Sequence, residues 1–465
     1  MTDRHVDRVF GTDGPSSALQ TALRAGEIPV SIYGLGKMGL PLAAVYADRT
    51  GSVLGVDVDP SVVESVNEGD AHVQGEPGLA SLVSEQVERG RLAATTDGIA
   101  AARTGRIHVL IVPTLVDEID RPDLSAVDAV LTDVASGLAP GDLVVVESTM
   151  PPRTTRDHIH PTLVDRSGLA ADAFGVAVCP ERTASGSALR DIRGRYPKVV
   201  GGIDSESTRA ATALYEVVTD GPVHPVSDAT TAEAVKLFEG IYRDVNIALA
   251  NEFARTATEL DISVREAIDR ANELPVCDIH EPGPGVGGHC IPNYPRFFTD
   301  RTETPTPLTA TARRVNERMP AVTVDRLAAA LEGRGGSLSS ATVAVLGVTY
   351  RSGVAELRNA PGLDVLEELQ ASGATTYAVD PLVEPDEVDV PLVDHTDLST
   401  LGLDAAIVVT HHDAFETIDW DDCAPMVILD GRDDVDVDSD RHRHVVLGGS
   451  KQPERTSRES KPPSP

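Results

Sequence analysis

A glycine-rich loop near residue 290 carries the side chain in this chain best suited to covalent chemistry. In the segment "GPGVGGHCIPNYP", residues 283–295, Cys290 follows Gly287, Gly288 and His289. Glycines let a ligand approach the backbone closely, and a neighbouring histidine favours the thiolate, the reactive form of cysteine. Cys290 is therefore a candidate nucleophile, with a metal ligand and a small apolar residue in a tight turn as the alternatives.

The cysteines are widely separated and include no CxxC pair, which argues against structural zinc and against a disulfide framework. They are Cys179, Cys277, Cys290 and Cys423. We expect free thiols and no metal site.

Lysine is scarce, so the few lysines present are candidates for specific roles. The chain has five lysines among 40 basic residues, and Lys236 lies in the helical segment "AEAVKLFEGIYRDVNIALANE". A lysine beside a hydroxyl that is being oxidised can stabilise negative charge or carry a proton. A solvated helix face is the plainer interpretation of the same residue.

A dinucleotide-binding pattern lies near the start of the chain. Gly34, Gly36 and Gly39 have GxGxxG spacing between an expected strand and an expected helix, and Asp57 ends the next expected strand. The glycines permit a tight turn and close approach of a pyrophosphate, and the acid accepts hydrogen bonds from ribose hydroxyls. Because a carboxylate repels a 2′-phosphate, the pattern predicts NAD rather than NADP.

Alternating strands and helices must position these groups. Short apolar runs separated by helical patterns to about residue 224 predict a parallel sheet with helices on both faces. Long helical patterns follow over 228–260, 264–273 and 308–331, and the alternation then returns. We predict an α/β fold of two doubly wound Rossmann-like domains joined by a central helical domain with a long helix. The expected parts are a polar leader (1–27), an NAD-binding domain (28–224), a central helical domain with the cysteine loop (225–332), a second α/β domain (333–447) and a disordered tail (448–465).

Composition limits the possible partners. The formal net charge of −33 disfavours nucleic acid, and no apolar run is long enough for a membrane span or a signal peptide. We expect a cytoplasmic protein that binds no membrane. An acidic, lysine-poor surface is typical of proteins from high-salt cytoplasm, where salt screens the repulsion between like charges.

Separated motifs from Val30 to Leu447 resemble those of the UDP-glucose/GDP-mannose dehydrogenase family, and within it the UDP-N-acetyl-D-mannosamine 6-dehydrogenase branch. The motifs are "GLGKMGLPLA", "VPT", "ESTMPPRTT", "CPERTASG", "AVKLFEGIYRDVNIALANEFA", "PGPGVGGHCIP" and "GVTYRSGVAELRNAPG". The resemblance implies oxidation of C6 of a UDP-sugar to a carboxylate with two NAD⁺, a homodimer or higher homo-oligomer formed through the central helix, and a C-terminal domain that binds the UDP-sugar. The product would serve surface polysaccharide or glycoprotein glycans.

The resemblance also implies roles for individual residues. Cys290 would attack the aldehyde and form a thiohemiacetal and then a thioester, Lys236 would stabilise the oxyanion or carry a proton, and Glu181 and Thr149 would activate water. The implied NAD contacts are Gly34, Gly36, Lys37, Met38, Gly39, Asp57, Thr114, Thr149 and Arg358. The implied UDP-sugar contacts are Arg182, Thr183, Lys236, Arg243, Gly287, Tyr350 and Arg351.

The chain departs from the family pattern near the proposed nucleophile. Gly240 replaces the usual Asn one turn after the lysine, and Tyr294 replaces the usual Asp four residues after the cysteine. Leu274 and Val276 stand where the branch has substrate-binding His and Arg, and Arg351 stands where lysine is usual. Two other hypotheses therefore stay open: a hydroxyacid dehydrogenase that stops after one hydride transfer, and a catalytically impaired protein that binds a nucleotide sugar. Another UDP-hexose is an alternative substrate.

Overall fold

The computed structural model describes residues 8–12, 14–117, 121–437 and 440–449, which form two compact units. Unit 1 is assigned Met1–Glu239 and Asn293–Pro305, and unit 2 is assigned Gly240–Pro292 and Thr306–Pro465. Each unit has hydrophobic cores of its own. The expected disordered tail lies, from residue 450 onward, outside the described residues.

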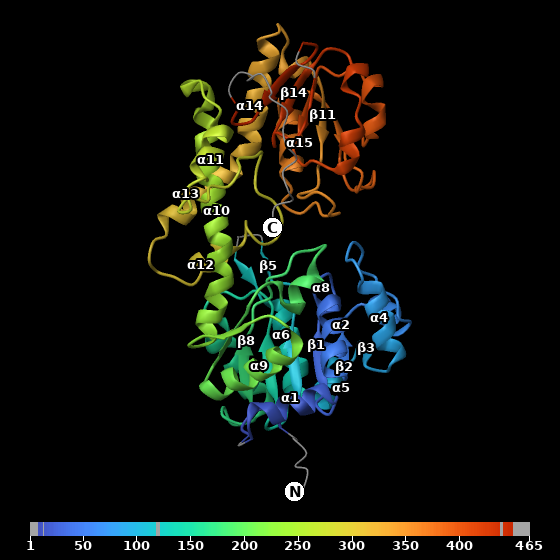
Figure 1. Cartoon of the computed structure of the whole chain (residues 1–465), viewed down its shortest axis with the longest axis vertical. Helices are drawn as coiled ribbons and strands as arrows, with labels where there is room; N and C mark the ends of the chain where they lie inside the picture. Colours follow the sequence, from blue (N-terminus) through green and yellow to red (C-terminus); the bar gives the residue numbers. More distant parts are fainter. Residues whose placement is uncertain (1–7, 13, 118–120, 438–439, 450–465) are drawn as a thin grey trace. The chain divides into compact units, whose positions relative to one another are not determined.

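Unit 1 is built on one sheet of eight strands in the order β10-β9-β8-β7-β4-β1-β2-β3, coloured from blue to green in Figure 1. The strands are β1 (Val30–Tyr33), β2 (Val53–Val56), β3 (Leu92–Thr95), β4 (Ile107–Leu110), β7 (Leu143–Val146), β8 (Gly175–Val178), β9 (Lys198–Gly202) and β10 (Val223–Pro225). A separate antiparallel pair joins β5 (Leu115–Val116) and β6 (Pro122–Asp123). The predicted parallel, doubly wound arrangement is confirmed for most of the sheet.

The strand β9 differs from the prediction because it runs antiparallel to β8. The segment between β8 and β9 holds only the short helical pieces α8 (Ala188–Arg190) and η2 (Asp191–Arg195). It contains no long crossover helix of the kind that returns a chain to the opposite edge of a sheet. The chain therefore turns back and starts β9 near the C-terminal end of β8. Lys198, the first residue of β9, consequently lies beside the residues that follow β8.

Helices cover both faces of this sheet, as its strand residues require. Leu143 and Val145 belong to one core, whereas Val144 and Val146 belong to the other, because successive side chains of a strand point to opposite faces. The helices of unit 1 are α1 (Ser16–Arg24), α2 (Gly39–Thr50), α3 (Pro60–Asn67), α4 (Leu79–Glu88), α5 (Gly98–Thr104), α6 (Ser125–Gly137), η1 (Thr155–Ile159), α7 (His160–Ser167), α9 (Ser205–Val218) and α12 (Tyr294–Thr299). Several begin at an aspartate cap, such as Asp59 before α3 and Asp204 before α9.

The predicted polar leader contains an element that the sequence patterns did not indicate. Helix α1 buries Leu19, Ala22 and Leu23 in the same core as α2 and α9. Its polar residues lie on the opposite side, so the helix is amphipathic although the segment is not apolar on average.

Unit 2 contains a parallel sheet of five strands in the order β12-β11-β13-β14-β15. Its strands are β11 (Thr342–Leu346), β12 (Thr375–Val379), β13 (Ala405–Val408), β14 (Val427–Asp430) and β15 (Arg443–Val446). Its helices are α11 (Val264–Ala271), α13 (Pro307–Glu317), α14 (Met319–Glu332), η3 (Leu338–Ser340), α15 (Pro361–Ala371), η4 (His395–Thr400), η5 (Asp413–Thr417) and η6 (Trp420–Asp422). The helical pattern expected over 308–331 forms two helices, because the helix is interrupted at Arg318, ahead of Pro320.

The long helix expected over 228–260 is present as α10 (Ala229–Leu260). It contributes its first residues to unit 1 and the remainder to unit 2. Among the described residues, no helix is both long enough and apolar enough to cross a membrane.

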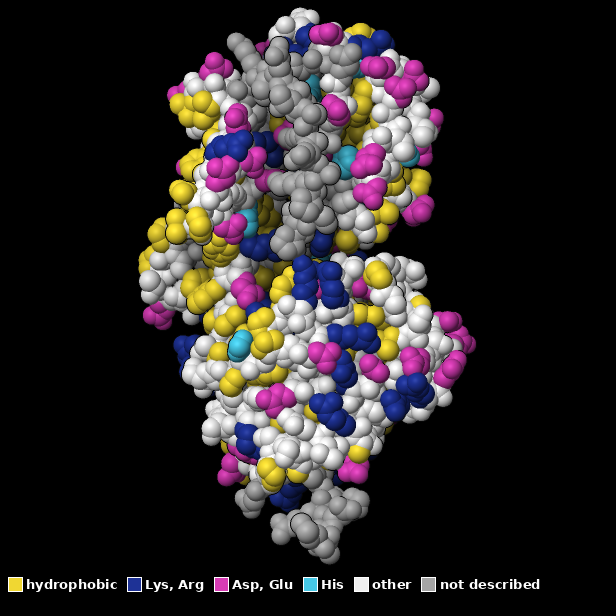
Figure 2. Space-filling model, in the orientation of Figure 1, with side chains coloured by type: hydrophobic (Ala, Val, Ile, Leu, Met, Phe, Trp, Pro, Cys, Tyr) yellow, Lys and Arg dark blue, Asp and Glu magenta, His cyan; other side chains and the backbone are white. Residues whose placement is uncertain are grey.

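The face drawn in Figure 2 carries its acidic residues without one dominant patch. On the face drawn in Figure 2, acidic side chains (magenta) and basic side chains (dark blue) are interspersed over each unit. Such dispersal keeps many acids solvated, which fits the expectation of an acidic surface.

Candidate active site

The loop after β1 has the backbone geometry of a phosphate cradle. Gly34 has φ +100°, and a side chain there would come within 2.8 Å of the Ile111 carbonyl oxygen. A side chain on Gly39, the first residue of α2, would meet the Gly34 carbonyl oxygen at 1.9 Å. Glycine is required at both positions, and the tight turn leaves the N-terminus of α2 open to an anion.

The surroundings of this loop fit NAD. Gly36 is exposed, and no atom lies within 4 Å of the place where a Cβ would be, so a ligand can approach the backbone there. Asp57 follows β2 and accepts a hydrogen bond from Leu35 N at 2.8 Å through one oxygen and from Asp59 N at 3.1 Å through the other. Each carboxylate oxygen can accept further bonds, so the aspartate stays available to ribose hydroxyls.

Other predicted NAD contacts lie at the same edge of the sheet. Thr114 follows β4, Thr149 follows β7, and the Thr114 hydroxyl donates to the Thr149 carbonyl at 2.7 Å. Lys37 is exposed beside Gly36, and the Thr183 hydroxyl lies 4.0 Å from the sulfur of Met38. Unit 1 therefore brings these predicted residues together where its parallel strands end, the usual ligand site of such sheets.

Strand register places three charged side chains side by side in unit 1. In the antiparallel pair β8 and β9, Val178 is opposite Gly201, and continuing by three residues places Glu181 opposite Lys198. Glu181 N also donates to the carbonyl of Glu147, the residue after β7, at 3.0 Å. Lys198 Nζ contacts Glu181 Oε2 at 2.7 Å, and all three residues are buried.

Burial and the charge of Lys198 determine which of the two carboxyls in this cluster is protonated. Burial raises the pKa of Glu147 to about 8 against the opposing pull of Lys198. Burial also acts to raise the pKa of Glu181, but Lys198 outweighs it and lowers that pKa to about 2. Near neutral pH, Glu147 therefore holds a proton while Glu181 and Lys198 form an ion pair.

The predicted catalytic Lys236 lies on the first turns of α10, next to an aromatic ring. Its ammonium lies 5.9 Å from the ring centre of Tyr294, a buried residue at the start of α12. Lys236 is also among the charges that lower the pKa of Glu181. Tyr294, expected from the sequence to be a departure from the family pattern, thus gives the lysine a cation–π partner.

Arg182, predicted to bind the sugar nucleotide, is engaged within unit 1. Its guanidinium contacts Glu239 at 2.7 Å and donates to the Pro197 carbonyl. These bonds tie the segment after β8 to α10 and to the start of β9.

In unit 2, the glycines before Cys290 pack against the segment 350–359. A Cβ on Gly287 would come within 2.5 Å of the Asn359 carbonyl oxygen, and Gly288 has φ +84° with the Tyr350 ring 3.0 Å from its Cβ position. Gly288 N donates to the Arg358 carbonyl at 3.3 Å, and the Asn359 amide donates to the Gly288 carbonyl at 3.1 Å. This packing brings the predicted residues Gly287, Tyr350 and Arg358 close to Cys290.

Cys290 is exposed, in contrast to the buried Cys179 and Cys423. Burial raises the pKa of Tyr350, Arg351 lowers it and Cys290 raises it, so Cys290 lies within electrostatic reach of that ring. The neighbouring His289 lies 3.5 Å from Glu356, which also contacts the Arg358 guanidinium at 3.1 Å. His289, which is predicted to favour a thiolate at Cys290, therefore also interacts with the Glu356 carboxylate.

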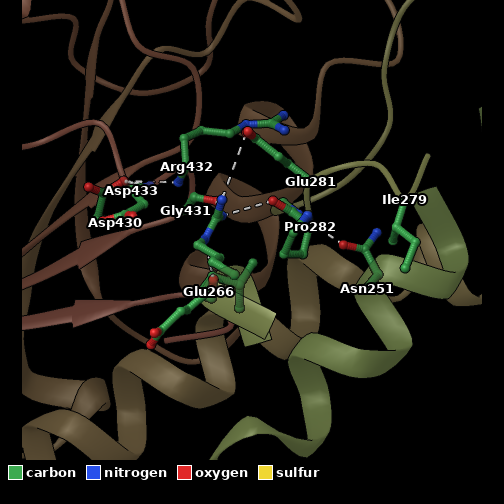
Figure 3. A network of polar contacts seen from close by, with 12 residues as sticks. Asn251, Glu266, Ile279, Glu281, Pro282, Asp430, Gly431, Arg432 and Asp433 are labelled. Atoms are coloured by element: carbon green, nitrogen blue, oxygen red, sulfur yellow. Dashed lines mark hydrogen bonds and ion pairs between the residues drawn. The ribbon is translucent and has the colours of Figure 1, made fainter. Parts of the chain in front are cut away.

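An arginine clamp fixes the base of the cysteine loop. Arg265 donates to the carbonyl oxygens of Leu447, Pro282 and Gly431 at 2.9 to 3.0 Å. Asn251 accepts a bond from Gly283 N at 2.9 Å from the other side. Figure 3 shows Asn251, Pro282 and Gly431 converging on this point from α10, the loop and the end of β14. The clamp holds these three backbone carbonyls, and Arg265 also lies 4.0 Å from the Glu281 carboxylate.

The remaining departures have different surroundings within unit 2. Leu274 and Val276 are 59% and 90% exposed, and Gly240 is buried on α10. Arg243 is exposed on α10 and helps to lower the pKa of His280, after burial and against Asp278. In the part of the chain that the structure describes, no group of three or more His, Cys, Asp or Glu is arranged to hold a metal ion.

Sequence patterns missed Glu147 and Arg265, and they indicated Lys198 only as one of the scarce lysines without a stated role. Glu147 opens the quoted motif "EST", and Lys198 is one of the rare lysines, so both carried a signal. Arg265 carried none, because it is one of thirty-five arginines and its hydrogen-bond partners are backbone carbonyls of residues far along the chain.

The chain matches three models of one family. These are the NAD binding domain (residues 28–219), the central domain (230–318) and the UDP binding domain (344–437) of the UDP-glucose/GDP-mannose dehydrogenase family. A UDP-N-acetyl-D-mannosamine dehydrogenase of Pyrococcus horikoshii is 35% identical over 87% of this chain and 95% of its own length. An NDP-N-acetyl-D-galactosaminuronic acid dehydrogenase of Ralstonia nicotianae is 34% identical over the same shares of the two chains.

Solved structures similar to this chain come from proteins with the same names as these relatives. The structure of a UDP-D-ManNAc dehydrogenase from Pyrococcus horikoshii has a TM-score of 0.81 at 33% identity, covering 90% of this chain and 99% of that one. An NDP-N-acetyl-D-galactosaminuronic acid dehydrogenase from Methanosarcina mazei has a TM-score of 0.80 at 30% identity, covering 93% and 98%. The chain belongs to the UDP-glucose/GDP-mannose dehydrogenase family and is an NAD-dependent oxidoreductase.

Proposed function

We propose that this enzyme oxidises C6 of a UDP-sugar, with UDP-N-acetyl-D-mannosamine as the first choice, to the uronic acid through a cysteine thioester. The observation that carries the proposal is the exposed Cys290 at the end of a glycine segment held by Tyr350, Asn359 and Arg358. A thiol that is exposed while its backbone is fixed has the properties of a nucleophile and not of a core residue. The activities for which the relatives are named support the substrate class.

NAD⁺, when bound, supplies the two-electron acceptor, and two are needed because an alcohol loses four electrons on becoming an acid. The side chains of the enzyme bind the aldehyde, stabilise the oxyanion and orient the water. Cys290 adds to the aldehyde and holds it covalently, which prevents its escape between the two oxidations. Lys236 stabilises the developing oxyanion, and Glu181 with Thr149 orients the water that cleaves the thioester.

The residues proposed to contact the sugar nucleotide are Arg182, Thr183, Lys236, Arg243, Gly287, Tyr350 and Arg351. The expected division into parts, 1–27, 28–224, 225–332, 333–447 and 448–465, is retained as a proposal that the three matching family models support. We also propose cytoplasmic activity in high salt, for which the net charge of −33 is the support, and use of the product in surface glycans.

One stoichiometry tests the reaction. The protein is incubated in molar KCl with NAD⁺ and UDP-N-acetylmannosamine, UDP-N-acetylgalactosamine, UDP-N-acetylglucosamine or UDP-glucose, and NADH is measured per sugar consumed. Two NADH per sugar is the expected result, highest in rate with the first substrate. One NADH per sugar would favour the single-step enzyme and contradict the proposal.

A catalytically impaired nucleotide-sugar-binding protein is the second candidate. Its support is that Tyr294 replaces a carboxylate beside Lys236 and that apolar Leu274 and Val276 are exposed where polar residues are usual. Measurable UDP-sugar binding by calorimetry with no NADH from any substrate would favour this candidate over the enzyme.

We further propose a homodimer formed through α10. Tyr242, Leu249, Phe253 and Leu260 are exposed and follow one another at intervals of seven, four and seven residues, which places them on one face of the helix. Light scattering should report a dimer for the natural chain and a monomer for a Leu249→Glu, Phe253→Glu variant. A natural chain that is monomeric at micromolar concentration in molar KCl would refute the dimer.

A further inference from the structure

Glu147 is a buried carboxyl in unit 1 to which the proposed chemistry gives no role. It directly follows β7, between the sheet and the helices α2 and α9, and is fully inaccessible to solvent. Burying an ionisable group in this way is costly unless the surroundings compensate. Its surroundings therefore need an explanation.

Two hydroxyls converge on one oxygen of this carboxyl. Tyr46 from α2 and Tyr215 from α9 donate to Glu147 Oε1 at 2.9 and 2.7 Å. The other oxygen, Oε2, has no hydrogen bond of ordinary geometry among the described residues. A carboxyl that accepts two bonds at one oxygen has its second oxygen available to carry a proton.

Glu181 is the group with which Glu147 can exchange that proton. Cys179 and Glu181 are two residues apart, so both side chains point to the same face of the sheet. Glu147, which lies opposite Cys179 in the register of β7 and β8, points to that face as well. The two carboxyls shift each other's pKa, and Lys198 acts on both. The titratable groups that face Glu147 are Tyr46 of α2, Cys179 and Glu181 after β8, Lys198 of β9 and Tyr215 of α9.

Glu181 alone is a weak base for activating water. Its carboxylate is paired with Lys198 at 2.7 Å, and its other oxygen accepts a bond from Arg182 N at 2.7 Å. A carboxylate stabilised in this way can orient a water molecule but retains a proton poorly. A second acceptor is needed if the proton is to stay on the enzyme.

We propose that Glu147 and Glu181 act as one base, in which Glu181 takes a proton from the attacking water and Glu147 holds it. This inference rests on the proposed function, because it concerns the acid-forming step. Water adds to the acyl carbon of the thioester, the carbon–sulfur bond breaks and Cys290 leaves as thiolate. One proton of the water passes to the carboxyl pair, and the other stays on the carboxylic acid product.

The pair can accept this proton only when Glu147 is ionised. Since burial raises the pKa of Glu147 to about 8, turnover should rise with pH through that region. Glu147 is a positioning and proton-holding residue that acts through Glu181.

The test compares pH–rate profiles of the natural enzyme and Glu147→Gln in molar KCl. We expect kcat of the natural enzyme to rise with pH to a plateau above an inflection near 8. In Glu147→Gln the inflection should disappear and kcat at the plateau should fall by about tenfold to a hundredfold, with KM little changed. A rapid first release of two NADH per site should remain, because the oxidations precede the step that is slowed.

The matched control is Glu233→Gln. Glu233 is another buried acid of unit 1, and burial raises its pKa to about 7, but it accepts bonds from the backbone N–H groups of Arg153 and Thr155. Its replacement should leave the inflection near pH 8 in place. Tyr215→Phe provides a second variant if Glu147→Gln folds poorly: it removes a donor that favours the charged form of Glu147, so the inflection should move to higher pH.

The outcomes separate this inference from the proposed function. A natural enzyme that forms no NADH refutes the proposed function. A natural enzyme that forms two NADH per sugar, with the same pH profile in Glu147→Gln or an unmoved inflection in Tyr215→Phe, refutes the role of Glu147.

Discussion

The two units hold their reactive groups in opposite ways. In unit 1, Glu147, Glu181 and Lys198 are buried, Glu181 and Lys198 form an ion pair, and Glu147 holds a proton near neutral pH. In unit 2, Cys290 is exposed, and what is fixed is the backbone that leads to it, through Arg265 and the packing of Gly287 and Gly288.

The difference fits the roles that we propose for these groups. A proton-transfer group needs a pKa set by its surroundings, and burial, alone or beside other charges, can shift a pKa by several units. A thiol that attacks an incoming aldehyde needs access and a fixed position, which backbone hydrogen bonds provide without covering the sulfur. Unit 1 should therefore be sensitive to the loss of charges, and unit 2 to the loss of backbone bonds.

Lys198→Met should have the largest effect on stability. It leaves the Glu181 carboxylate buried without its partner, and removing one member of a buried ion pair costs roughly 3–5 kcal/mol. Guanidinium unfolding checks this, with Arg89→Met as the control because the Arg89 and Glu85 side chains are about half exposed. The control should lose less than about 1 kcal/mol. Equal losses in the two variants would show that the cluster is not a paired buried unit.

The same cluster predicts how stability changes with pH. Glu147 has a folded pKa of about 8 against an ordinary value of 4.5, so its contribution is complete below 4.5 and is lost as the pH rises through 8. Glu181 has the opposite sign: its lowered pKa contributes above 4.5 and is lost as the pH falls through about 2. Between pH 5 and 8 the free energy of unfolding should fall faster in the natural chain than in Glu147→Gln, by at most about 1.4 kcal/mol per pH unit. Parallel curves from urea unfolding would contradict the raised pKa.

Arg265→Lys tests the backbone clamp of unit 2. Lysine keeps the charge but cannot reach the carbonyls of Leu447, Pro282 and Gly431 together, so we expect a loss of about 1–3 kcal/mol and slower alkylation or turnover at Cys290. Arg270→Lys is the control, since Arg270 is exposed and pairs with Glu273 on the surface. If both variants behave like the natural chain in unfolding and in reaction with iodoacetamide, the clamp does not position the loop.

Tyr294 should give the smallest effect and show what the departure from the family contributes. Tyr294→Phe keeps an aromatic face near Lys236 and should change kcat by less than about threefold, whereas Tyr294→Leu removes it and should cost about 0.5–2 kcal/mol of stabilisation of the ammonium. The measured quantities are kcat and the pH dependence of the step that uses Lys236. Equal losses in Tyr294→Phe and Tyr294→Leu would mean that the hydroxyl, not the ring, is the important feature.

Local patterns predicted what depends on local backbone. Gly34, Gly39 and Asp57 were assigned from spacing alone, and the predicted long helix differs from α10 by one residue at its start. The pairing of Lys198 with Glu181 could not be predicted, because it depends on the antiparallel direction of β9, which a short apolar run does not reveal. The clamp by Arg265 was invisible for a related reason: backbone carbonyls leave no signature in side-chain types.

The replacement Cys290→Ser tests whether the reaction passes through a covalent cysteine intermediate. We expect uronic acid formation to fall by at least about a thousandfold while NAD binding, followed by fluorescence, is retained. Cys277→Ser, which changes a partly buried cysteine of the same unit, should keep full activity. Unchanged acid formation in Cys290→Ser would contradict the covalent mechanism.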